Sequence, residues 1–375
     1  MKTLVLGGYG NFGARICRAL SGDPSLQLLV GGRNRARADA LAAELGHGAQ
    51  GLAIDHSAPD FAQTLRQLGV TLLIHTAGPF QQQDYGVARA AAAAGAHYID
   101  LADGRRFVCD FPQALQAAFA AAGRSAISGA STVPALSSAV VEHLCAGWQR
   151  VDSIDTCIAP AQTAPRGKAT LAAVLSYCGE ALQVWDEGRW QAQRGWAAPQ
   201  QVHFARLRPR LGALCDIPDL ELFPTRYAVR QRVMFRAALE VGFTQRAFAL
   251  LASLHAWGVL ARPARLAGLL NTSARALDFL GTPLGGMVVR VEGLDATGRA
   301  ARRAWHIAAD HDHGPEIPCM AAVLLARRLA HGQPHQSLPV GASACMGLLT
   351  LADFAPEFTR WGMVTDVVDE ERAGA

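Results

Sequence analysis

Short β-rich runs alternate with alanine-rich helical stretches over the first 130 residues of the chain. Alternation of this kind is typical of a parallel sheet covered by helices. The apolar and β-branched runs predict strands at residues 3–6, 26–31, 51–54, 71–75, 97–101 and 125–128. The stretches between them predict helices at residues 12–20, 35–45, 60–67, 85–94 and 111–122. The pattern therefore favours an α/β doubly wound sheet, with its ligand at the carboxyl ends of the strands.

The regular alternation ends near Pro134. A predicted helix at 136–145 and a predicted strand at 153–159 are followed by a long, less regular stretch. Two β-rich runs at 287–293 and 302–308, joined by a five-residue loop, then predict a hairpin. These runs indicate a second α+β domain that contains an antiparallel sheet. A helix at 317–331 and a polar tail at 369–375 complete the pattern.

Composition agrees with two folded domains. The chain has 375 residues, of which 50% are hydrophobic and 18% charged, enough apolar surface for more than one core. The net charge of +4 comes from scattered arginines, so the sequence lacks the clustered basic residues that are typical of nucleic-acid binding. The eight cysteines have no metal-knuckle spacing, and the apolar run at the N-terminus is too short for a signal peptide. Reduced thiols in the cytoplasm fit this pattern best.

Residues 247–270 are strongly apolar, but His255, Arg262, Pro263 and Arg265 interrupt them. A membrane-spanning helix needs about 20 predominantly apolar residues. The interruptions favour a buried or amphipathic helix pair over membrane contact.

The strongest local motif is a strand that runs into Gly8-x-Gly10-x-x-Gly13 and then into a helix. In the fold that binds dinucleotides, known as the Rossmann fold, these glycines allow a tight turn, close approach to pyrophosphate and close packing of helix on strand. The helix start at Asn11 and Phe12 offers backbone N–H groups to phosphate. These features predict a dinucleotide site at the first turn.

The end of the second strand indicates which dinucleotide binds. A site selective for NAD carries Asp or Glu there, whereas this chain has Gly32, Arg33, Asn34 and Arg35. Arginine at this position pairs with a 2′-phosphate through charge-assisted hydrogen bonds. The cofactor predicted from these residues is NADP(H), although the same arginines also suit the surface of a helix.

Two further segments lie at strand ends. Small residues Ala77, Gly78 and Pro79 follow the fourth strand, where the nicotinamide ribose lies in a doubly wound fold. Tyr98 and Asp100 are two residues apart on the fifth strand and so share one of its faces. Such a pair can orient a substrate or relay a proton, and it equally suits an interface tyrosine with a capping aspartate.

The order and spacing of these motifs resemble the NADP-binding domain of saccharopine dehydrogenase-like oxidoreductases. The resemblance rests on the glycine turn, Gly32-Arg33-Asn34, the 77–80 segment, Gly95-x-His97-Tyr98-x-Asp100 and the small-residue segment 128–134. It implies three parts: residues 1–135 bind NADP(H), residues 136–310 receive a small-molecule substrate, and residues 311–375 pack back on the first part. It also implies hydride transfer at a C=N bond of an amino-acid-like substrate.

The resemblance leaves alternatives open. Related proteins also include enoyl reductases that act on C=C bonds of lipidic substrates, and a Rossmann fold can bind NADP(H) without catalysis. A homodimer formed through sheet edges is a further option. The segment 310–318 resembles a loop of bacterial members, and the imidazole of its His313 suits protonation of an amine nitrogen. The acidic and histidine residues of this loop are consecutive and have no second ligand cluster, so no metal site is predicted.

Overall fold

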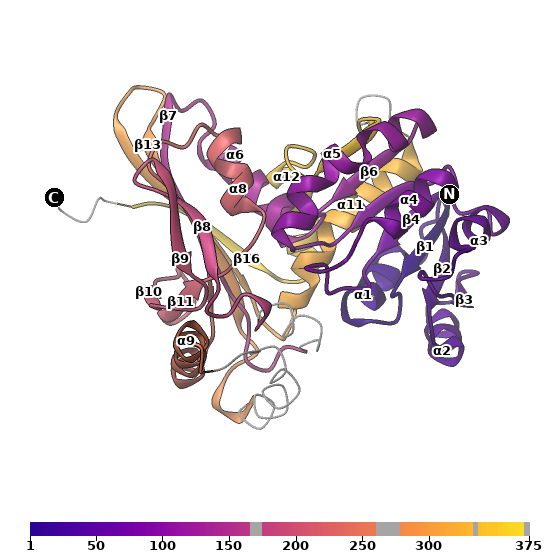
Figure 1. The fold of residues 1–375 in the computed structure, drawn as a ribbon, viewed down its shortest axis with the longest axis horizontal. Coiled ribbons are helices and arrows are strands. Elements are labelled where there is room, and N and C mark those ends of the chain that lie inside the picture. The colour runs from indigo at the N-terminus through magenta and orange to yellow at the C-terminus, as the bar shows by residue number, and fades with distance from the viewer. Residues whose placement is uncertain (166–174, 260–277, 333–336, 371–375) are drawn as a thin grey trace. The chain divides into compact units, whose positions relative to one another are not determined.

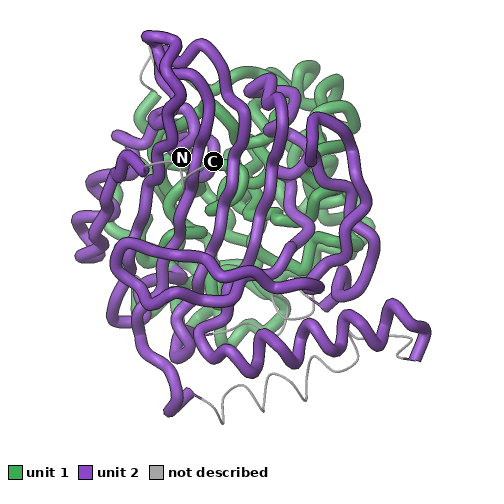
Figure 2. Tube along the Cα trace, turned by 90° about the vertical axis from the view of Figure 1, so that its left-hand side faces the viewer, with its two compact units in different colours: residues 1–136, 316–349 green, residues 137–315, 350–375 purple. Residues whose placement is uncertain are grey.

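The computed structural model describes residues 1–165, 175–259, 278–332 and 337–370. The chain divides into two compact units, coloured separately in Figure 2. Unit 1 comprises residues 1–136 and 316–349, and unit 2 comprises residues 137–315 and 350–375. The predicted C-terminal segment, 311–375, is therefore divided between the two units.

Unit 1 is built on a seven-stranded sheet in which all neighbouring strands are parallel (Figure 1). The strand order β15-β6-β5-β4-β1-β2-β3 contains the doubly wound order in which β1 lies between β2 and β4. The central strands are buried along their whole length because helices cover both faces. The α/β fold class and the six predicted strands are confirmed. The strands are β1 (Lys2–Leu6), β2 (Gln27–Gly32), β3 (Gln50–Ala53), β4 (Leu72–His75), β5 (His97–Asp100), β6 (Ser125–Ser128) and β15 (Gly341–Ala344).

The helices of unit 1 form two groups. Helices α2 and α11 contact α1, and helices α3 and α5 contact α4, as expected when helices flank both faces of a sheet. Their bounds are α1 (Asn11–Leu20), α2 (Arg35–Leu45), α3 (Phe61–Gln67), α4 (Gly86–Ala93), α5 (Arg105–Ala122) and α11 (Ile317–His331).

Helix α5 begins six residues before the predicted start at residue 111. The prediction placed Pro112 in the first turn, where its missing N–H group needs no partner. In the structure Pro112 lies inside the helix and cannot donate a hydrogen bond to the carbonyl of Val108. Buried Phe107, Phe111 and Leu115 lie on one side of α5, and their packing outweighs the lost bond.

The seventh strand, β15, was not predicted. Its four residues, Gly-Ala-Ser-Ala, carry no apolar alternation, so the sequence offers no strand signal there. The side-chain oxygen of Gln116 on α5 accepts a hydrogen bond from the backbone N–H of Ala342 at 2.7 Å. A Cβ atom at Gly341, whose φ is +107°, would collide with the same Gln116 side chain. Tertiary packing against α5 therefore fixes this strand.

Helix α11 agrees with the predicted helix at both ends. Arg15 on α1 forms an ion pair with Glu316, and Arg327 donates a hydrogen bond to the carbonyl of Ala19 at 2.8 Å. The thiol of Cys319 lies 3.6 Å from the carbonyl oxygen of Phe12. These contacts hold α11 against the first helix of the Rossmann unit.

Unit 2 contains a nine-stranded mixed sheet with the path β10-β11-β12-β7-β13-β14-β16, to which β8 and β9 are attached through β12. All strand pairs are antiparallel except β7 with β12. The predicted hairpin is confirmed as β13 and β14. The strands are β7 (Arg150–Ala159), β8 (Ala181–Asp186), β9 (Arg189–Arg194), β10 (Gln200–Val202), β11 (Arg210–Leu214), β12 (Arg232–Ala238), β13 (Gly285–Leu294), β14 (Ala300–Ala309) and β16 (Val364–Asp369).

Helices α6 (Ser137–Leu144) and α8 (Asp219–Arg226) pack on this sheet, and α12 (Leu351–Arg360) contacts α6. Trp305 on β14 is buried, and its ring lies 6.0 Å from that of Phe358 on α12. These large apolar side chains form part of the core of unit 2. Helix α12 and strand β16 were not predicted.

Helix α9 (Gly242–Ala256) covers the first part of the apolar stretch 247–270. Residues 260–270 of that stretch lie outside the described residues, so the expected helix pair stays a prediction. Within the described ranges, no helix is long and apolar enough to cross a membrane.

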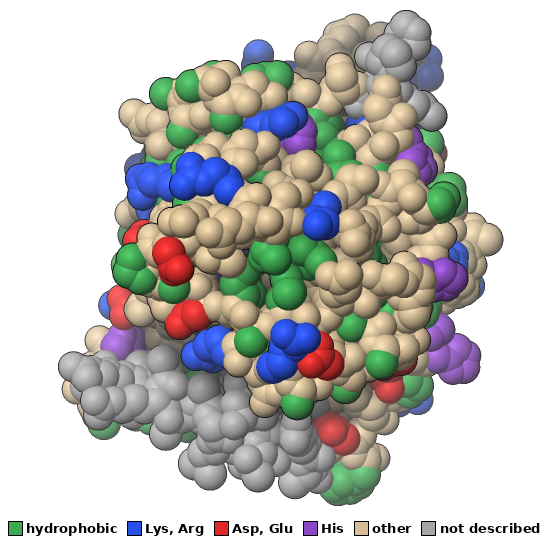
Figure 3. All heavy atoms as spheres, turned by 90° about the vertical axis from the view of Figure 1, so that its right-hand side faces the viewer, with side chains coloured by type: hydrophobic (Ala, Val, Ile, Leu, Met, Phe, Trp, Pro, Cys, Tyr) green, Lys and Arg blue, Asp and Glu red, His purple; other side chains and the backbone are tan. Residues whose placement is uncertain are grey.

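The surface drawn in Figure 3 carries its basic side chains in separate small groups. Acidic side chains lie close to several of these groups. This face therefore lacks the continuous basic stripe with which proteins contact a nucleic-acid backbone.

Thr350 is expected to contribute to the stability of α12. Its hydroxyl accepts a hydrogen bond from the N–H of Asp353, whose carboxylate accepts one from the N–H of Thr350 at 2.7 Å. This capping box satisfies two helix-terminal donors, so T350A should lower the free energy of unfolding by about 1 kcal/mol. All seven tryptophans belong to unit 2, and urea unfolding followed by their fluorescence measures the change. T350S keeps the hydroxyl and serves as the control; an equal loss in both variants contradicts the assignment.

Candidate functional site

In the sheet of unit 1 the strand order reverses at β1, because β2 and β3 follow on one side of it and β4, β5 and β6 on the other. Strand β1 pairs with β2 on one side and with β4 on the other. The loops after β1 and β4 consequently lead away from the same edge of the sheet, where doubly wound folds bind their ligands. The predicted cofactor residues lie on these two loops, at the end of β2 and just after it, and in the first turns of α1 and α2.

The glycine turn after β1 leaves no space for side chains at critical positions. The N–H groups of Gly7 and Gly8 both donate to the carbonyl of Gly31, at 2.9 and 3.0 Å. A Cβ atom at Gly8 would lie 2.8 Å from the carbonyl oxygen of Val5, and one at Gly13 would lie 2.8 Å from Thr76 Oγ1. Helix α1 then starts at Asn11 and Phe12, with Gly10 as its N-cap and no side-chain cap. The helix start is therefore open to an anionic ligand.

The loop after β4 touches this turn. A Cβ atom at Gly7 would lie 2.9 Å from Thr76 Oγ1 and 3.2 Å from the backbone nitrogen of Ala77. The side chain of Gln83 donates to the carbonyls of Ala77 and Pro79, at 2.7 and 2.9 Å. The structure thus brings the predicted segment Ala77–Gly78–Pro79 next to the glycine turn and holds its backbone in place.

The loop after β2 carries the residues predicted to select the cofactor. Asn34 caps α2 by accepting a hydrogen bond from the N–H of Arg37 at 3.0 Å. Arg35 forms an ion pair with Asp39 at 2.7 Å, four residues further along the helix. Arg33 is exposed at the end of β2 and makes no hydrogen bond or ion pair with any described residue. Of the two predicted arginines, only Arg33 has a guanidinium that is not already bound to a carboxylate.

Tyr9 was missed as part of this site. Its hydroxyl accepts a hydrogen bond from the N–H of Asn34 at 2.8 Å, and its ring would occupy the position of any Cβ at Gly32. The guanidinium of Arg37 lies 4.6 Å above the same ring, within the range of a cation–π contact. Tyr9 therefore connects the turn after β1 with the turn after β2. An aromatic residue inside the glycine motif was the available signal for this role.

Behind these loops lies a buried polar group made of His75, Tyr98 and Asp100. The register of β4 and β5 sets His75 beside Asp100, and the Tyr98 hydroxyl shares a hydrogen bond of 3.0 Å with His75 Nδ1. One carboxylate oxygen of Asp100 accepts hydrogen bonds from the N–H groups of Ala102 and Gly129 and from the hydroxyl of Ser128, at 2.8–3.0 Å. Asp100 thereby joins the ends of β5 and β6.

Burial controls the protonation of this group. It lowers the pKa of His75 to about 3, with a smaller effect from the charge of His56, so the imidazole is neutral near pH 7. Burial raises the pKa of Asp100 to about 6, against the opposing effect of its hydrogen bonds. Burial also raises the pKa of Tyr98 well above 10. His75 was not among the predicted site residues, although its position at the end of the fourth strand was visible in the sequence.

His313 belongs to unit 2, whereas Tyr98 and Asp100 belong to unit 1. Its Nδ1 lies 3.0 Å from the carbonyl oxygen of Trp361, and its ring packs at 5.0 Å against the indole of the same residue. A carbonyl can only accept, so Nδ1 carries the proton and Nε2 is left for other contacts. The roles of Tyr98, Asp100 and His313 in chemistry stay predictions. Within the described ranges, no cluster of three or more His, Cys, Asp or Glu side chains could hold a metal ion.

The raised pKa of Asp100 predicts a pH-dependent effect on stability. Folding disfavours the charged carboxylate, so the penalty is complete above the folded pKa near 6 and fades as the pH falls toward the usual 3.8. The parent protein should therefore gain about 2 kcal/mol of unfolding free energy relative to D100N as the pH falls from 7.5 to 4.5. Urea unfolding followed by circular dichroism checks this. D60N makes the same substitution at an exposed position, and equal pH dependence in both variants rules out the buried carboxylate as the cause.

Comparison with known proteins agrees with this geometry. Residues 3–127 match the family model of the saccharopine dehydrogenase NADP binding domain. A sequence search of the curated proteins finds no significant match.

Among solved structures, saccharopine dehydrogenase (L-Glu forming) from Saccharomyces cerevisiae is similar over 99% of this chain and 100% of its own, with a TM-score of 0.70 and 12% identity. Homospermidine synthase from Legionella pneumophila is similar over 100% and 93%, with a TM-score of 0.60 and 8% identity. At these identities the structures establish a shared fold. The match to the family model confirms the resemblance drawn from the motifs: residues 3–127 form a domain of the saccharopine dehydrogenase NADP-binding type.

Proposed function

We propose that this protein is an NADP(H)-dependent oxidoreductase that transfers hydride to or from a C=N bond of a small, amino-acid-like substrate. The observation that carries the proposal is the backbone contact between the turn after β1 and the loop after β4, at the edge where β1 and β4 diverge. Two backbones with small side chains meet there and form a surface that can lie flat against a dinucleotide. The match of residues 3–127 to an NADP-binding family supports the same cofactor.

The residues present fit the cofactor. The open start of α1 suits the pyrophosphate, because its N–H groups and the positive end of the helix dipole favour anions. Glycine at positions 8 and 13 keeps side chains out of this cradle. Ala77 and Gly78, held by Gln83, would lie along the nicotinamide ribose.

The selection of NADP(H) over NAD(H) is assigned to Arg33. Residues 31–38 contain no carboxylate that could bind a ribose 2′-hydroxyl. The guanidinium of Arg33 is exposed and unpaired among the described residues, so a 2′-phosphate can take up its donors without breaking an existing ion pair. Arg37 lies in the first turn of α2, with its guanidinium over the Tyr9 ring.

The cofactor supplies the hydride, and the protein supplies orientation and a proton. His75, Tyr98 and Asp100 form the fixed, buried polar group behind the loops. In this proposal they act by positioning the loop backbones. His313 is the candidate proton donor. Its Nδ1 is engaged with the Trp361 carbonyl, so Nε2 carries a proton only in the imidazolium form, which suits donation to an amine nitrogen.

Replacing Arg33 tests the cofactor assignment. R33A removes the proposed partner of the 2′-phosphate and should weaken NADPH binding roughly ten- to hundredfold while leaving NADH binding unchanged. Titration followed by nucleotide fluorescence measures both constants. R18A is the matched control, because Arg18 is an exposed arginine of α1 paired with Glu44. Equal losses for NADPH and NADH, or no binding of either nucleotide to the parent protein, refute the assignment.

Turnover with defined substrates tests the reaction. NADPH oxidation is followed with 2-oxo acids plus amines, which form imines, and separately with enoyl compounds. Oxidation with the first group supports the proposal, and oxidation with enoyl compounds alone replaces it with a C=C reductase. Nucleotide that binds but stays reduced with every substrate indicates a binding module. In an active enzyme, H313A should lower kcat about a hundredfold, the lower end expected for a lost general acid, with NADPH binding unchanged.

A further inference from the structure

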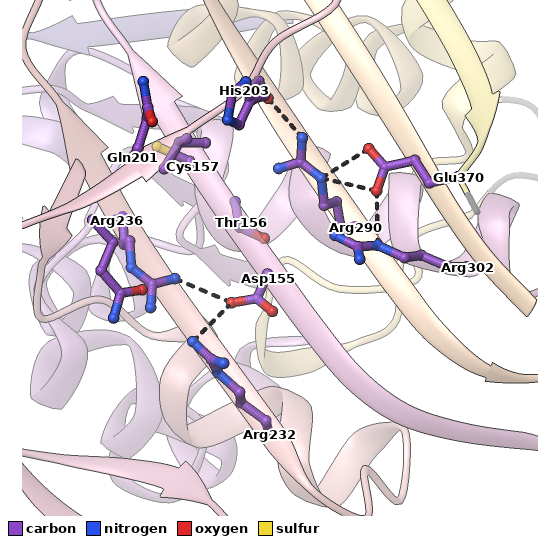
Figure 4. Close-up of a pocket in the computed structure, with 12 residues that line it drawn as sticks. Asp155, Thr156, Cys157, Gln201, His203, Arg232, Arg236, Arg290, Arg302 and Glu370 are labelled. Atoms are coloured by element: carbon purple, nitrogen blue, oxygen red, sulfur yellow. Dashed lines mark hydrogen bonds and ion pairs between the residues drawn. The ribbon is translucent and has the colours of Figure 1, made fainter. Parts of the chain in front are cut away.

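A pocket of about 560 Å³ opens on the sheet of unit 2. Its lining comes from strands β7, β10, β12, β13 and β14 and from the chain after β16, all within the one unit. Arg232 and Arg236 on β12 lie on one side of β7, and Arg290 on β13 and Arg302 on β14 lie on the other (Figure 4). No residue of the proposed cofactor site takes part in this lining.

Each carboxylate of the pocket is shared by two arginines. Asp155 lies 3.1 Å from a guanidinium nitrogen of Arg236 and 3.6 Å from one of Arg232. On the other side of the pocket, Glu370 lies 3.0 Å from Arg290 and 2.8 Å from Arg302 (Figure 4). At Asp155, therefore, two positive charges face one negative charge, and at Glu370 the same holds within the lining, although Glu292 outside it adds a second carboxylate next to Arg302.

The arginines of the pocket are incompletely neutralised. Arg232 Nε is buried and has no hydrogen-bond partner among the described residues. Arg290 also donates to the carbonyl of His203 at 2.6 Å, and Arg302 lies 3.3 Å from Glu292, which is outside the lining. The charged lining residues are four arginines and two carboxylates, a net charge of +2. Excess positive charge in a partly enclosed pocket is stabilised by an anionic ligand.

The guanidinium groups are sheltered but reachable. The side chains of Arg236 and Arg290 are 13% and 15% exposed, and that of Arg232 is 36% exposed. Charge pairs in such positions are screened less by salt than pairs on an open surface. Cys157 and Val202 contribute apolar surface, and burial raises the pKa of the Cys157 thiol to about 12, so it stays protonated. Apolar walls with a few convergent polar groups are typical of small-molecule sites.

We propose that this pocket binds a small molecule with two anionic groups, carboxylate or phosphate, one at the Arg232–Arg236 pair and one at the Arg290–Arg302 pair. The paired forks of arginine match the geometry of both anions. Asp155 and Arg290 are direct neighbours across β7 and β13, so the two pairs belong to one continuous surface of the sheet. The inference concerns a site in unit 2 and does not depend on the proposed oxidoreductase activity.

A second copy of the chain is a poorer occupant. In a twofold dimer formed through this surface, each pocket would face its own copy, and two net positive charges would oppose each other. A dianionic small molecule neutralises the same excess. The test below also measures oligomeric state, so that an interface between copies appears as a separate result.

Calorimetric titration with citrate and with pyrophosphate, at constant ionic strength and with acetate as a singly charged reference, tests the proposal on the full chain. R232Q is the informative variant, because Asp155 keeps its hydrogen bond to Arg236 and no carboxylate is left alone. Its affinity for the bound anion should fall at least about tenfold. R189Q removes an equally charged but exposed arginine of β9 and should change the affinity less than about twofold.

A third variant works in the opposite direction. D155N removes the carboxylate that competes for Arg232 and Arg236, so the anion should bind several-fold more tightly. This gain cannot arise from misfolding. Saturable binding of either probe with this order of variants supports the proposal, and preference for citrate or pyrophosphate identifies the anion as carboxylate or phosphate. The proposal is overturned if neither probe saturates or if R189Q loses as much affinity as R232Q. It is also overturned if no anion binds and sedimentation shows a dimer that the R232Q substitution dissociates.

Discussion

The contact between two backbone turns, one after β1 and one after β4, is the constraint on which unit 1 depends. At Gly7, Gly8 and Gly13 a single Cβ atom would meet backbone or the Thr76 hydroxyl within about 3 Å. The strands can lie side by side with their loops touching only because these side chains are absent. The same absence leaves bare peptide groups on the surface, which is what a dinucleotide requires. Packing and ligand binding thus make the same demand on the sequence.

The buried polar group behind these loops is stabilised by hydrogen bonds to side chains and not by the absence of side chains. Asp100 is fully buried and ties two strand ends together through three hydrogen bonds to one oxygen. Such an arrangement is rigid because each donor is satisfied only in one geometry. In unit 2, by contrast, charged residues lie on the open part of a sheet and share partners. The first unit uses buried polarity to fix its backbone, whereas the second keeps paired arginines and carboxylates partly exposed on its sheet.

Much of the fold was visible in the sequence, and the reasons differ between the units. The six predicted strands of unit 1 are short runs set between helical stretches, and helix α11 is a longer run rich in apolar residues, so their positions follow from the pattern along the sequence. Strand β15 has no such signal, since Gln116 and neighbouring strand β6 define it. The glycine motif and Arg33 could be proposed from the sequence because the chemistry they suggest is local. Tyr9 and His75 acquire their roles from residues about 25 positions away along the chain, and the pocket of unit 2 gathers side chains from residue 155 to residue 370.

The path of the chain between the units has a consequence for how the protein is made. The sheet of unit 1 contains β6 at residues 125–128 and its neighbour β15 at residues 341–344, separated by most of unit 2. A nascent chain therefore exposes the edge of β6 until more than 200 further residues have been synthesised. Open parallel edges of this kind recruit other strands, and contacts this distant in sequence form slowly. During synthesis, the vulnerable surface of this protein is the unfinished edge of its nucleotide-binding sheet.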